Sequence, residues 1–422
     1  MTQVRSILFP GGGPQLKESL ADYARRGGFE AYKKVLAAGR PDAVIEELVK
    51  SRLRGRGGAG FPVHQKLALC AAAPGEEKYV VVNGGEDEPG SHKDRTLLTY
   101  SPQAVLEGTL LAAYAIGADR VIFYINESYE SAHRRVGTAI NEARSLGYIG
   151  QNVLGSGFSV SVDVQPAPNP YVAGEDTAVL ESLEGRAPKP RQKPPYPVTA
   201  GLYGKPTIVN NVETFANLPP IMLHGGDWFR AIGTEESSGT MLFTLNDEWN
   251  NPGVYELPFG ATEGELLNTL GGGLKSGETL RAFLPGGPSS AFLLPDPNRI
   301  LSPEAIRAAG SSIGCGVMRG YGESACIMCA AHEIAAFFKK ECCGQCPACQ
   351  METNMLFMTL DRLRQGQLPI AGLAQVPTVL AFNKGKGFCS LINMPGPPIT
   401  SAIKLFPEDF EAHATTGKCR GK

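Results

Sequence analysis

Between residues 78 and 164, short runs rich in β-branched residues alternate with segments of helical periodicity. The strand-like runs lie at 78–82, 121–125 and 158–164, and the helix-like segments lie at 103–116 and 128–145. Strands interleaved with helices predict crossover units and therefore an α/β protein. In such sheets, ligands gather in the loops beyond the carboxyl ends of the strands. The acidic stretch Asn-Gly-Gly-Glu-Asp-Glu-Pro-Gly at 83–90 is expected to be one of those loops.

A glycine-rich stretch at 54–62, Arg-Gly-Arg-Gly-Gly-Ala-Gly-Phe-Pro, precedes the first strand-like run. Glycine accepts positive φ angles and lets a ligand lie directly on the backbone. An amphipathic run at 63–70 follows at once, so the loop is expected to open onto a helix N-terminus, which favours phosphate. The spacing fits neither the dinucleotide fingerprint nor the P-loop, and an ordinary turn is the alternative interpretation.

Composition narrows the class of protein. The 422 residues suffice for roughly two to four domains. A formal net charge of -2 gives no support to nucleic-acid binding, which usually shows a basic excess. The first ten residues lack the features of a secretory signal, and no apolar run reaches the ~18 residues of a membrane span. We therefore expect a cytoplasmic protein that neither binds nucleic acid nor crosses a membrane itself.

Ten cysteines in a chain without an export signal indicate metal or redox chemistry. Cys343, Cys346 and Cys349 follow a C-x2-C-x2-C pattern, and Cys389 comes later in the chain. Three closely spaced thiolates and a distant fourth are typical of a [4Fe–4S] cluster. Zinc and a thiol switch are the alternatives, and Cys342 could replace Cys343 as a ligand.

The remaining cysteines give a weaker signal. Cys326 and Cys329 form another C-x2-C pair, but this pair lies in an apolar, helix-like stretch, where buried cysteine acts as a small hydrophobe. Cys70, Cys315 and Cys419 are interpreted in the same way. The six histidines show no ligand spacing, so a histidine-based metal site is not expected.

The predicted domain boundaries follow changes of pattern along the chain. Residues 1–45 are interpreted as an N-terminal leader with a helix over 19–38, and 46–236 as the α/β domain. Strand, turn, strand and short helix signals predict a β-grasp module over 237–318, which could be a spacer or a docking module. Residues 319–422 are predicted to be a helical bundle that carries the cluster. A proline-rich arm at 187–211 is expected to be extended, as a linker or a cofactor wall.

Six ordered motifs between Leu53 and Cys389 resemble one known family. They are R-G-R-G-G-A-G-F-P, E-P-G-S-x-K-D-R, G-E-D-T-A-x-x-x-S-L-E-G, G-K-P-T-x-V-N-N-V-E-T, N-N-P-G-V-Y-E and C-G-Q-C-x-x-C. The chain resembles the NADH-oxidising flavoprotein subunit of respiratory complex I and the diaphorase subunits of NAD-linked hydrogenases and formate dehydrogenases. The resemblance implies a Rossmann-like domain for FMN and NADH, an SLBB-type β-grasp module, and a bundle with one [4Fe–4S] cluster.

The resemblance also implies roles for individual residues. Glu88 would face the nicotinamide, with Glu175 as the second catalytic candidate. Phe61 and Tyr196 would stack on the adenine, beside Lys193. The other expected contacts of the flavin and the nucleotide are Gly55, Gly57, Gly58, Ala59, Gly60, Lys66, Asn83, Glu86, Tyr171, Gly174, Asp176, Asn210, Asn211 and Thr214. The cluster ligands would be Cys343, Cys346, Cys349 and Cys389.

The chain departs from the family pattern at three places. Gly85 stands where the family has an aspartate, and Asp176 stands where it has a glutamate. These two changes bear on the flavin potential and on nucleotide choice. The third, Gln-Met-Glu-Thr at 350–353 in place of Arg-Glu-Gly-Thr, touches the surroundings of the cluster.

An electron path follows from the expected cofactors. A hydride carries two electrons and an iron–sulfur cluster accepts one, so a flavin is needed between them. The chain shows no thioredoxin-like [2Fe–2S] segment before Leu53 and no ferredoxin-like cysteine set after Cys389. A small [2Fe–2S] thioredoxin-like subunit and a larger reductase, dehydrogenase or respiratory assembly are the expected partners. The alternative functions are a structural electron-transfer subunit without nucleotide turnover and a zinc-bound docking protein.

Overall fold

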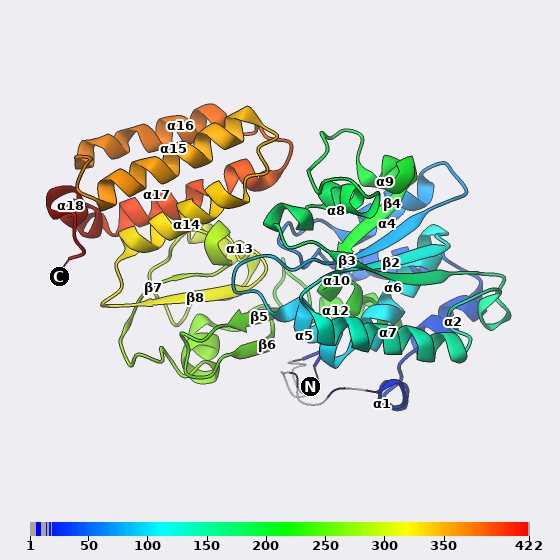
Figure 1. The fold of residues 1–422 in the computed structure, drawn as a ribbon. Coiled ribbons are helices and arrows are strands. Elements are labelled where there is room, and N and C mark those ends of the chain that lie inside the picture. The colour runs from blue at the N-terminus through cyan, green and yellow to red at the C-terminus, as the bar shows by residue number, and fades with distance from the viewer. Residues whose placement is uncertain (1–5, 10–13, 15–16, 18, 421–422) are drawn as a thin grey trace.

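A four-stranded parallel sheet organises the first half of the chain (Figure 1). In the computed structural model, which describes residues 6–9, 14, 17 and 19–420, its order is β3-β2-β1-β4. The strands are β1 (Tyr79–Gly84), β2 (Arg120–Asn126), β3 (Ser161–Ala167) and β4 (Thr207–Asn211). Strands β1, β2 and β3 confirm the three strands predicted from the sequence. Residues 1–5, 10–13, 15–16 and 18 of the predicted leader lie outside the described residues.

Alternation along β1 decides which helices cover each face of this sheet. Val80 and Val82 belong to the large core that contains α6 (Pro102–Ile116). Tyr79 and Val81 face a smaller core with α8 (Asp176–Leu183). The remaining helices of this half are α3 (Asp42–Ser51), α4 (Val63–Ala72), α5 (Lys93–Tyr100), α7 (Glu130–Ser145), α9 (Pro197–Ala200), α10 (Val212–Ala216), α11 (Leu218–His224) and α12 (Gly226–Arg230).

The segment predicted as a leader enters the cores of the protein. Backbone N–H groups of Leu8 and Phe9 donate to the buried Glu256 carboxylate at 2.9 and 2.8 Å. The predicted helix over 19–38 is two helices, α1 (Leu20–Arg25) and α2 (Glu30–Ala38). The break has a steric cause, because Gly27 has φ +92 and a Cβ on Gly28 would lie 2.1 Å from the Tyr23 ring.

A second, mixed sheet follows, with the order β6-β5-β8-β7. Its strands are β5 (Thr240–Leu245), β6 (Gly253–Pro258), β7 (Leu280–Leu284) and β8 (Val317–Gly322). The first and last strands run parallel at the centre, and each outer strand is antiparallel to its neighbour. This is the β-grasp arrangement predicted from the sequence. A π-helix (Glu265–Leu270) and α13 (Pro303–Ala308) complete the module.

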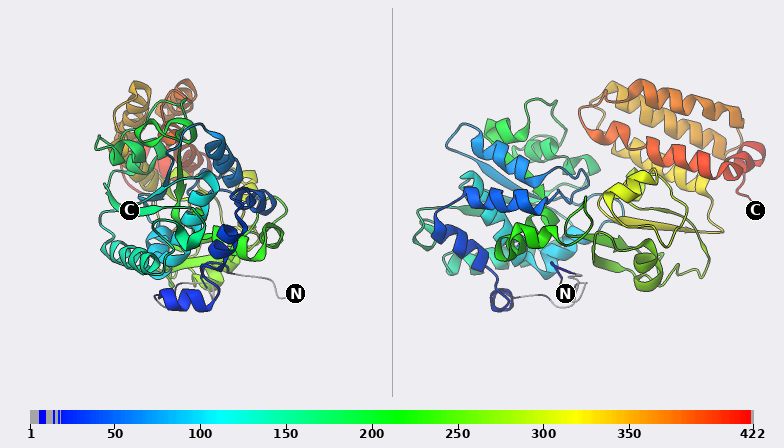
Figure 2. Two further views of the ribbon diagram at one scale, coloured as in Figure 1. Left: turned by 90° about the vertical axis from the view of Figure 1, so that its right-hand side faces the viewer. Right: turned by 180° about the vertical axis from the view of Figure 1, so that it is seen from behind.

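The last quarter is a helical bundle, seen at the upper left in Figure 1 and from behind in Figure 2. It comprises α14 (Ile327–Glu341), α15 (Pro347–Arg364), α16 (Gln375–Asn383), α17 (Gly396–Leu405) and α18 (Pro407–Thr416). Ile334 and Phe338 are buried, as their spacing predicts. The Arg281 guanidinium of β7 lies 2.7 Å from the Asp409 carboxylate of α18, so the bundle is tied to the second sheet. No helix of the described chain is long and apolar enough to cross a bilayer.

Candidate cofactor and nucleotide site

The glycine-rich loop closes on itself before α4. The Gly55 N–H donates to the Phe61 carbonyl at 2.9 Å, and the Arg54 guanidinium donates to the Gly60 carbonyl at 3.1 Å. Arg56 is buried and donates to the Ser238 and Thr240 carbonyls, which anchors the loop next to β5. The N-cap of α4 is Pro62, whose side chain caps nothing, and the first N–H of the helix, that of Val63, donates to the Leu53 carbonyl at 3.0 Å.

Two glycines of this loop are required by geometry. A Cβ on Gly57 would lie 3.1 Å from Cβ of Asn211, and Gly58 has φ +104. The Arg56 N–H donates to the Thr214 hydroxyl at 2.9 Å. The loop therefore lies against the end of β4 and the start of α10, which brings Gly57, Asn211 and Thr214 together.

The carboxyl ends of β1 and β4 lie side by side, with Val82 paired to Asn210 and Asn83 paired to Asn211. The Asn83 amide donates to the Gly174 carbonyl at 2.8 Å, which brings the loop before α8 to the same edge. Among the described residues, Asn210 Nδ2 is buried without a hydrogen-bond partner. An unpaired buried amide beside a loop of small residues fits the polar end of FMN, which these residues would hold.

The three carboxyl groups of the acidic loop after β1 have different surroundings. Glu86 accepts the Asp94 and Arg95 N–H groups at the start of α5, both at 2.9 Å. Burial and the nearby Asp94 charge raise the pKa of Glu86 to about 7. Burial also raises the pKa of Asp87 to about 8. These shifts reflect a dry site, where an additional charge is costly.

Glu88 points toward the second sheet and the bundle. Its carboxylate accepts the Tyr171 hydroxyl at 2.7 Å and the Ser289 hydroxyl at 3.1 Å. Burial raises the pKa of Glu88. The Tyr171 ring packs against Phe337 and Phe338 of α14. Glu88 thus lies where the α/β domain, the β-grasp module and the bundle meet.

A buried charge network beneath the loop was not predicted as part of the site. Lys93 Nζ lies 2.7 Å from Asp94 and 3.0 Å from Glu213, and all three side chains are at most 4% exposed. Lys93 also donates to Asn211 Oδ1 at 3.0 Å, and Asn211 donates to Asp94 at 2.6 Å. The network fixes the amide that faces Gly57. Lys93 and Asp94 occur in the E-P-G-S-x-K-D-R motif, so that motif was the one sign of this network in the sequence.

The expected nucleotide carboxylates form a cluster with Lys193. Lys193 Nζ lies 2.7 Å from Glu175 and 2.6 Å from Asp176. The other Glu175 oxygen caps α8 by accepting the Thr177 and Ala178 N–H groups. Burial and the neighbouring Asp176 raise the pKa of Glu175. Burial opposes ionisation of Asp176 too, but hydrogen bonds from Glu175 and Lys193 outweigh it and lower the pKa of Asp176.

The remaining predicted contacts surround this cluster. Lys66 donates to the Val209 carbonyl at 2.5 Å, and burial lowers the pKa of Lys66. Phe61 and Tyr196 are 49% and 57% exposed, so both rings are accessible to a base. The arm around Lys193 is irregular from 187 to 196 and bends at 193–195, where two peptide bonds are cis, and α9 and β4 follow it, so the prediction of an extended arm over 187–211 is wrong in part.

The predicted cluster cysteines gather at the end of the bundle. Cys342 Sγ lies 3.6 Å from Cys349 Sγ, and the Phe388 N–H donates to Cys346 Sγ at 3.3 Å. Burial raises the pKa of the Cys389 thiol to about 11, and the charges of Glu175, Cys343 and Cys346 add to the rise. Three thiols at the start of α15 and a fourth just before the 3-10 helix Ser390–Asn393 fit the ligand set of an iron–sulfur cluster. Gln345 donates to the Pro190 carbonyl at 2.6 Å, which joins this loop to the arm.

The structure differs from the expectation of buried core thiols for three of the other cysteines. Cys326, Cys329 and Cys419 are half-buried, and they meet His413. The four residues form a candidate ligand set that sequence spacing did not indicate, because the fold joins residues that are 84 to 90 positions apart. Cys70 is fully buried in the large core, as predicted. Cys315 is half-buried, and the Glu88 charge adds to the rise in its pKa that burial causes.

Comparison with known proteins agrees with this geometry. The Nuo51 FMN-binding domain matches residues 48–220, and the NADH-ubiquinone oxidoreductase-F iron-sulfur binding region matches residues 329–413. These matches confirm the predicted order of an FMN domain and an iron–sulfur region. They also place the glycine-rich loop and the acidic loop in the first region and the cysteines from 329 to 389 in the second.

Relatives cover nearly the whole chain. It is 38% identical over 401 residues to an NADH-quinone oxidoreductase subunit of Rhizobium meliloti, covering 95% of each chain. It is 37% identical to NADP-reducing hydrogenase subunit HndC of Solidesulfovibrio fructosivorans, covering 95% of this chain and 82% of the relative. A crystal structure of an NAD+-reducing [NiFe]-hydrogenase in the H2-reduced state superposes with a TM-score of 0.84 at 31% identity. The superposition covers 95% of this chain and 68% of that one. The relatives are subunits of larger enzymes, and this chain belongs to their family, that of the FMN-binding NADH-quinone oxidoreductase subunits.

Proposed function

We propose that the chain oxidises NADH through FMN and delivers single electrons through a [4Fe–4S] cluster to a partner subunit. One relationship carries the proposal most directly. Glu88 and Tyr171 are hydrogen-bonded to each other, and the Tyr171 ring packs on the helix that leads to Cys343. Tyr171 therefore links the acidic loop of the first sheet to the bundle that bears the cysteines.

In this proposal the chain provides position and electrostatics. Gly55, Gly57, Gly58, Ala59 and Gly60 lie under the cofactor, and Asn210 donates its unpaired amide to it. Asn83, Glu86 and Gly174 line the pocket, and Glu88 faces the nicotinamide. When bound, FMN accepts two electrons as a hydride and releases them singly, which is the chemistry that the side chains cannot supply.

The nucleotide would enter over the exposed rings of Phe61 and Tyr196. Lys193, Glu175 and Asp176 would meet its ribose, because they form the charged wall of the arm. Cys343, Cys346, Cys349 and Cys389 would hold the cluster. The contact between Gln345 and Pro190 supports this placement, since it brings the cysteine loop against the nucleotide wall.

We divide the chain accordingly into an N-terminal leader (1–45), an FMN and NADH domain (46–236), an SLBB-type module (237–318) and a cluster bundle (319–422). The electrons would pass to a small [2Fe–2S] thioredoxin-like subunit and then to a larger reductase, dehydrogenase or respiratory assembly. The complex would work in the cytoplasm, in either direction of electron flow.

A dye-reduction assay tests the function. The purified protein, reconstituted with FMN and iron under anaerobic conditions, is expected to reduce ferricyanide with NADH. Glu88→Gln should reduce the rate while FMN and iron contents stay unchanged. Full FMN and iron contents without NADH-dependent reduction in the wild type would instead identify a structural electron-transfer subunit.

A further inference from the structure

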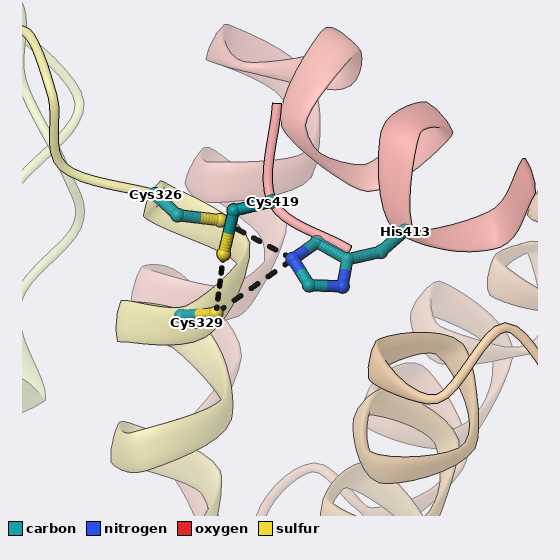
Figure 3. Close-up of side chains that lie close together, drawn as sticks. All are labelled: Cys326, Cys329, His413 and Cys419. Carbon is teal, nitrogen blue, oxygen red and sulfur yellow. Dashed lines mark hydrogen bonds between the residues drawn. The ribbon is translucent and has the colours of Figure 1, made fainter. Parts of the chain in front are cut away.

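A second group of metal-ligating side chains lies at the opposite end of α14 from Cys343 (Figure 3). Cys326 and Cys329 begin this helix, His413 lies in α18, and Cys419 follows α18. One ligand atom from each of the four residues lies within 4.8 Å of all the others. The function proposed above uses none of them.

The separations match a single tetrahedral ion. His413 Nε2 lies 3.5 Å from Cys326 Sγ and 3.7 Å from Cys329 Sγ, and Cys329 Sγ lies 3.7 Å from Cys419 Sγ. Zinc bonds of about 2.3 Å to sulfur and about 2.0 Å to nitrogen, at tetrahedral angles, require about 3.8 Å between sulfurs and about 3.5 Å between sulfur and nitrogen. These three separations are thus those expected around one zinc ion, and the other pairs of ligand atoms lie within 4.8 Å.

The imidazole is oriented for coordination. His413 is 2% exposed, and its Nδ1 lies 3.0 Å from the Arg364 carbonyl oxygen. A carbonyl only accepts, so Nδ1 carries the proton and the lone pair of Nε2 points toward the thiols. Metal-bound histidines commonly show this outer hydrogen bond to a backbone carbonyl.

Other uses of the four residues fit the geometry less well. A disulfide requires about 2.05 Å between sulfurs, far below the 3.7 Å between Cys329 and Cys419. In a [4Fe–4S] cluster each cysteine binds a different iron, which requires wider ligand separations than those around one ion. Three cysteines and one histidine leave no open position, which is typical of structural zinc.

We infer that Cys326, Cys329, His413 and Cys419 bind one structural Zn2+ ion. The ion joins the end of the described chain to the start of α14. Asp409 makes a neighbouring connection, because it accepts the Ile327 N–H at 2.7 Å and pairs with Arg281. Zinc would therefore hold α18 against the helix that leads to the cluster cysteines, without taking part in electron transfer.

Metal analysis of the full chain tests this inference. Protein purified anaerobically from zinc-supplemented medium is expected to contain about one zinc ion per chain in addition to its cluster iron. Cys419→Ser should lose the zinc and keep iron and FMN. Cys349→Ser should lose iron and keep zinc, which separates the two sites. Cys70→Ala, which removes a buried lone thiol, is the matched control and should keep both metals.

A second variant and a spectroscopic probe cover the case in which Cys419→Ser does not fold. His413→Cys retains four ligands and should keep zinc. Cobalt added to zinc-depleted protein should give the visible bands of a tetrahedral cobalt–thiolate site in the wild type and in Cys349→Ser. The inference is overturned by iron-containing wild type without zinc, by loss of iron in folded Cys419→Ser protein, or by a disulfide between Cys329 and Cys419 in anaerobic protein.

Discussion

The Lys193 amino group lies 2.6 Å from the Asp176 carboxylate, so the acid expected to repel a 2′-phosphate is already paired. The resemblance to the family implies that Glu175 and Asp176 lie near the ribose, and two carboxylates there would favour NADH over NADPH. Lys193 offsets part of that charge, and its own pKa is raised by Asp176 and Glu175, although burial opposes the rise. The preference for NADH is therefore expected to depend on Asp176 and Lys193 together.

Asp176→Ala should raise the ratio of NADPH-driven to NADH-driven dye reduction about tenfold, which corresponds to about 1.4 kcal/mol. The substitution removes a negative charge and leaves the Lys193 ammonium with fewer carboxylate partners, so it can meet a 2′-phosphate. Steady-state rates with both nucleotides measure the effect. Asp163→Ala, at an exposed position of β3, is the control. An unchanged ratio in Asp176→Ala would show that this carboxylate does not set nucleotide choice.

Gly58→Val should abolish FMN binding. The positive φ of Gly58 disfavours a β-branched residue, and a side chain would project from the loop on which the cofactor is proposed to lie. Flavin absorbance after gel filtration measures the loss. Gly117→Val introduces the same strain at φ +72 in an open position after α6 and should keep the flavin. Normal flavin content in Gly58→Val would rule out the loop as the cofactor site.

Cys343→Ser should lose cluster iron, whereas Cys342→Ser should keep it. Both thiols lie near the predicted ligands, and Cys342 contacts Cys349 directly. The C-x2-C-x2-C spacing nevertheless favours Cys343 as the ligand. Iron analysis and EPR of the dithionite-reduced protein distinguish them. The opposite result would make Cys342 the ligand and would change the predicted register of the loop.

Lys93→Met should destabilise the protein by about 3–5 kcal/mol, because it leaves Asp94 and Glu213 buried and unpaired. Denaturant titration of the anaerobic protein measures the change. Lys205→Met removes an exposed ion pair with Glu77, in which the side chains are 46% and 60% exposed. This control should change stability by less than about 1 kcal/mol. Equal effects would show that the buried network contributes little.

Asp87→Asn should flatten the pH dependence of stability. Burial raises the pKa of Asp87 from 3.8 to about 8, so the folded state binds this proton more tightly than the unfolded state. Stability is therefore lost as the pH rises through this window, by at most about 4 kcal/mol at pH 7. Unfolding midpoints at pH 5.5 and 8 should differ more in the wild type than in Asp87→Asn. Asp163→Asn is the exposed control, and parallel profiles for Asp87→Asn would contradict the shifted pKa.

The sequence predicts the elements whose apolar pattern is strong. The runs at 78–82 and 121–125 became adjacent parallel strands because they are buried on both faces. Strand β4 was missed, since Thr207–Asn211 follows a proline-rich arm and ends in two asparagines. The helix α5 was missed as well, because its first turn contains Lys93 and Asp94, whose burial depends on a partner 118 residues away from Lys93.

The candidate site, too, is predicted from the sequence in part only. The resemblance implies a pocket role for Glu175, Asp176 and Lys193, but the sequence does not predict the ion pairs among them. Those pairs depend on how the extended arm returns across α8. Likewise, the C-x2-C pair at 326 and 329 resembles ordinary core cysteine until α18 brings His413 beside it. Long-range contacts of this kind have no periodicity and cannot be read along the chain.

The buried Glu256 carboxylate has a consequence for protein engineering. It accepts N–H groups from Ile7, Leu8 and Phe9 on one side of the β-grasp module, while Arg281 pairs with Asp409 on the other. Two buried charged side chains of the module thus have partners in segments that are far from it in sequence. The β-grasp module therefore cannot be replaced by that of a relative without changing other segments. A chimera with a relative's module needs the matching N-terminal segment and α18, because otherwise one carboxylate and one guanidinium lose the partners that keep them stable in the interior.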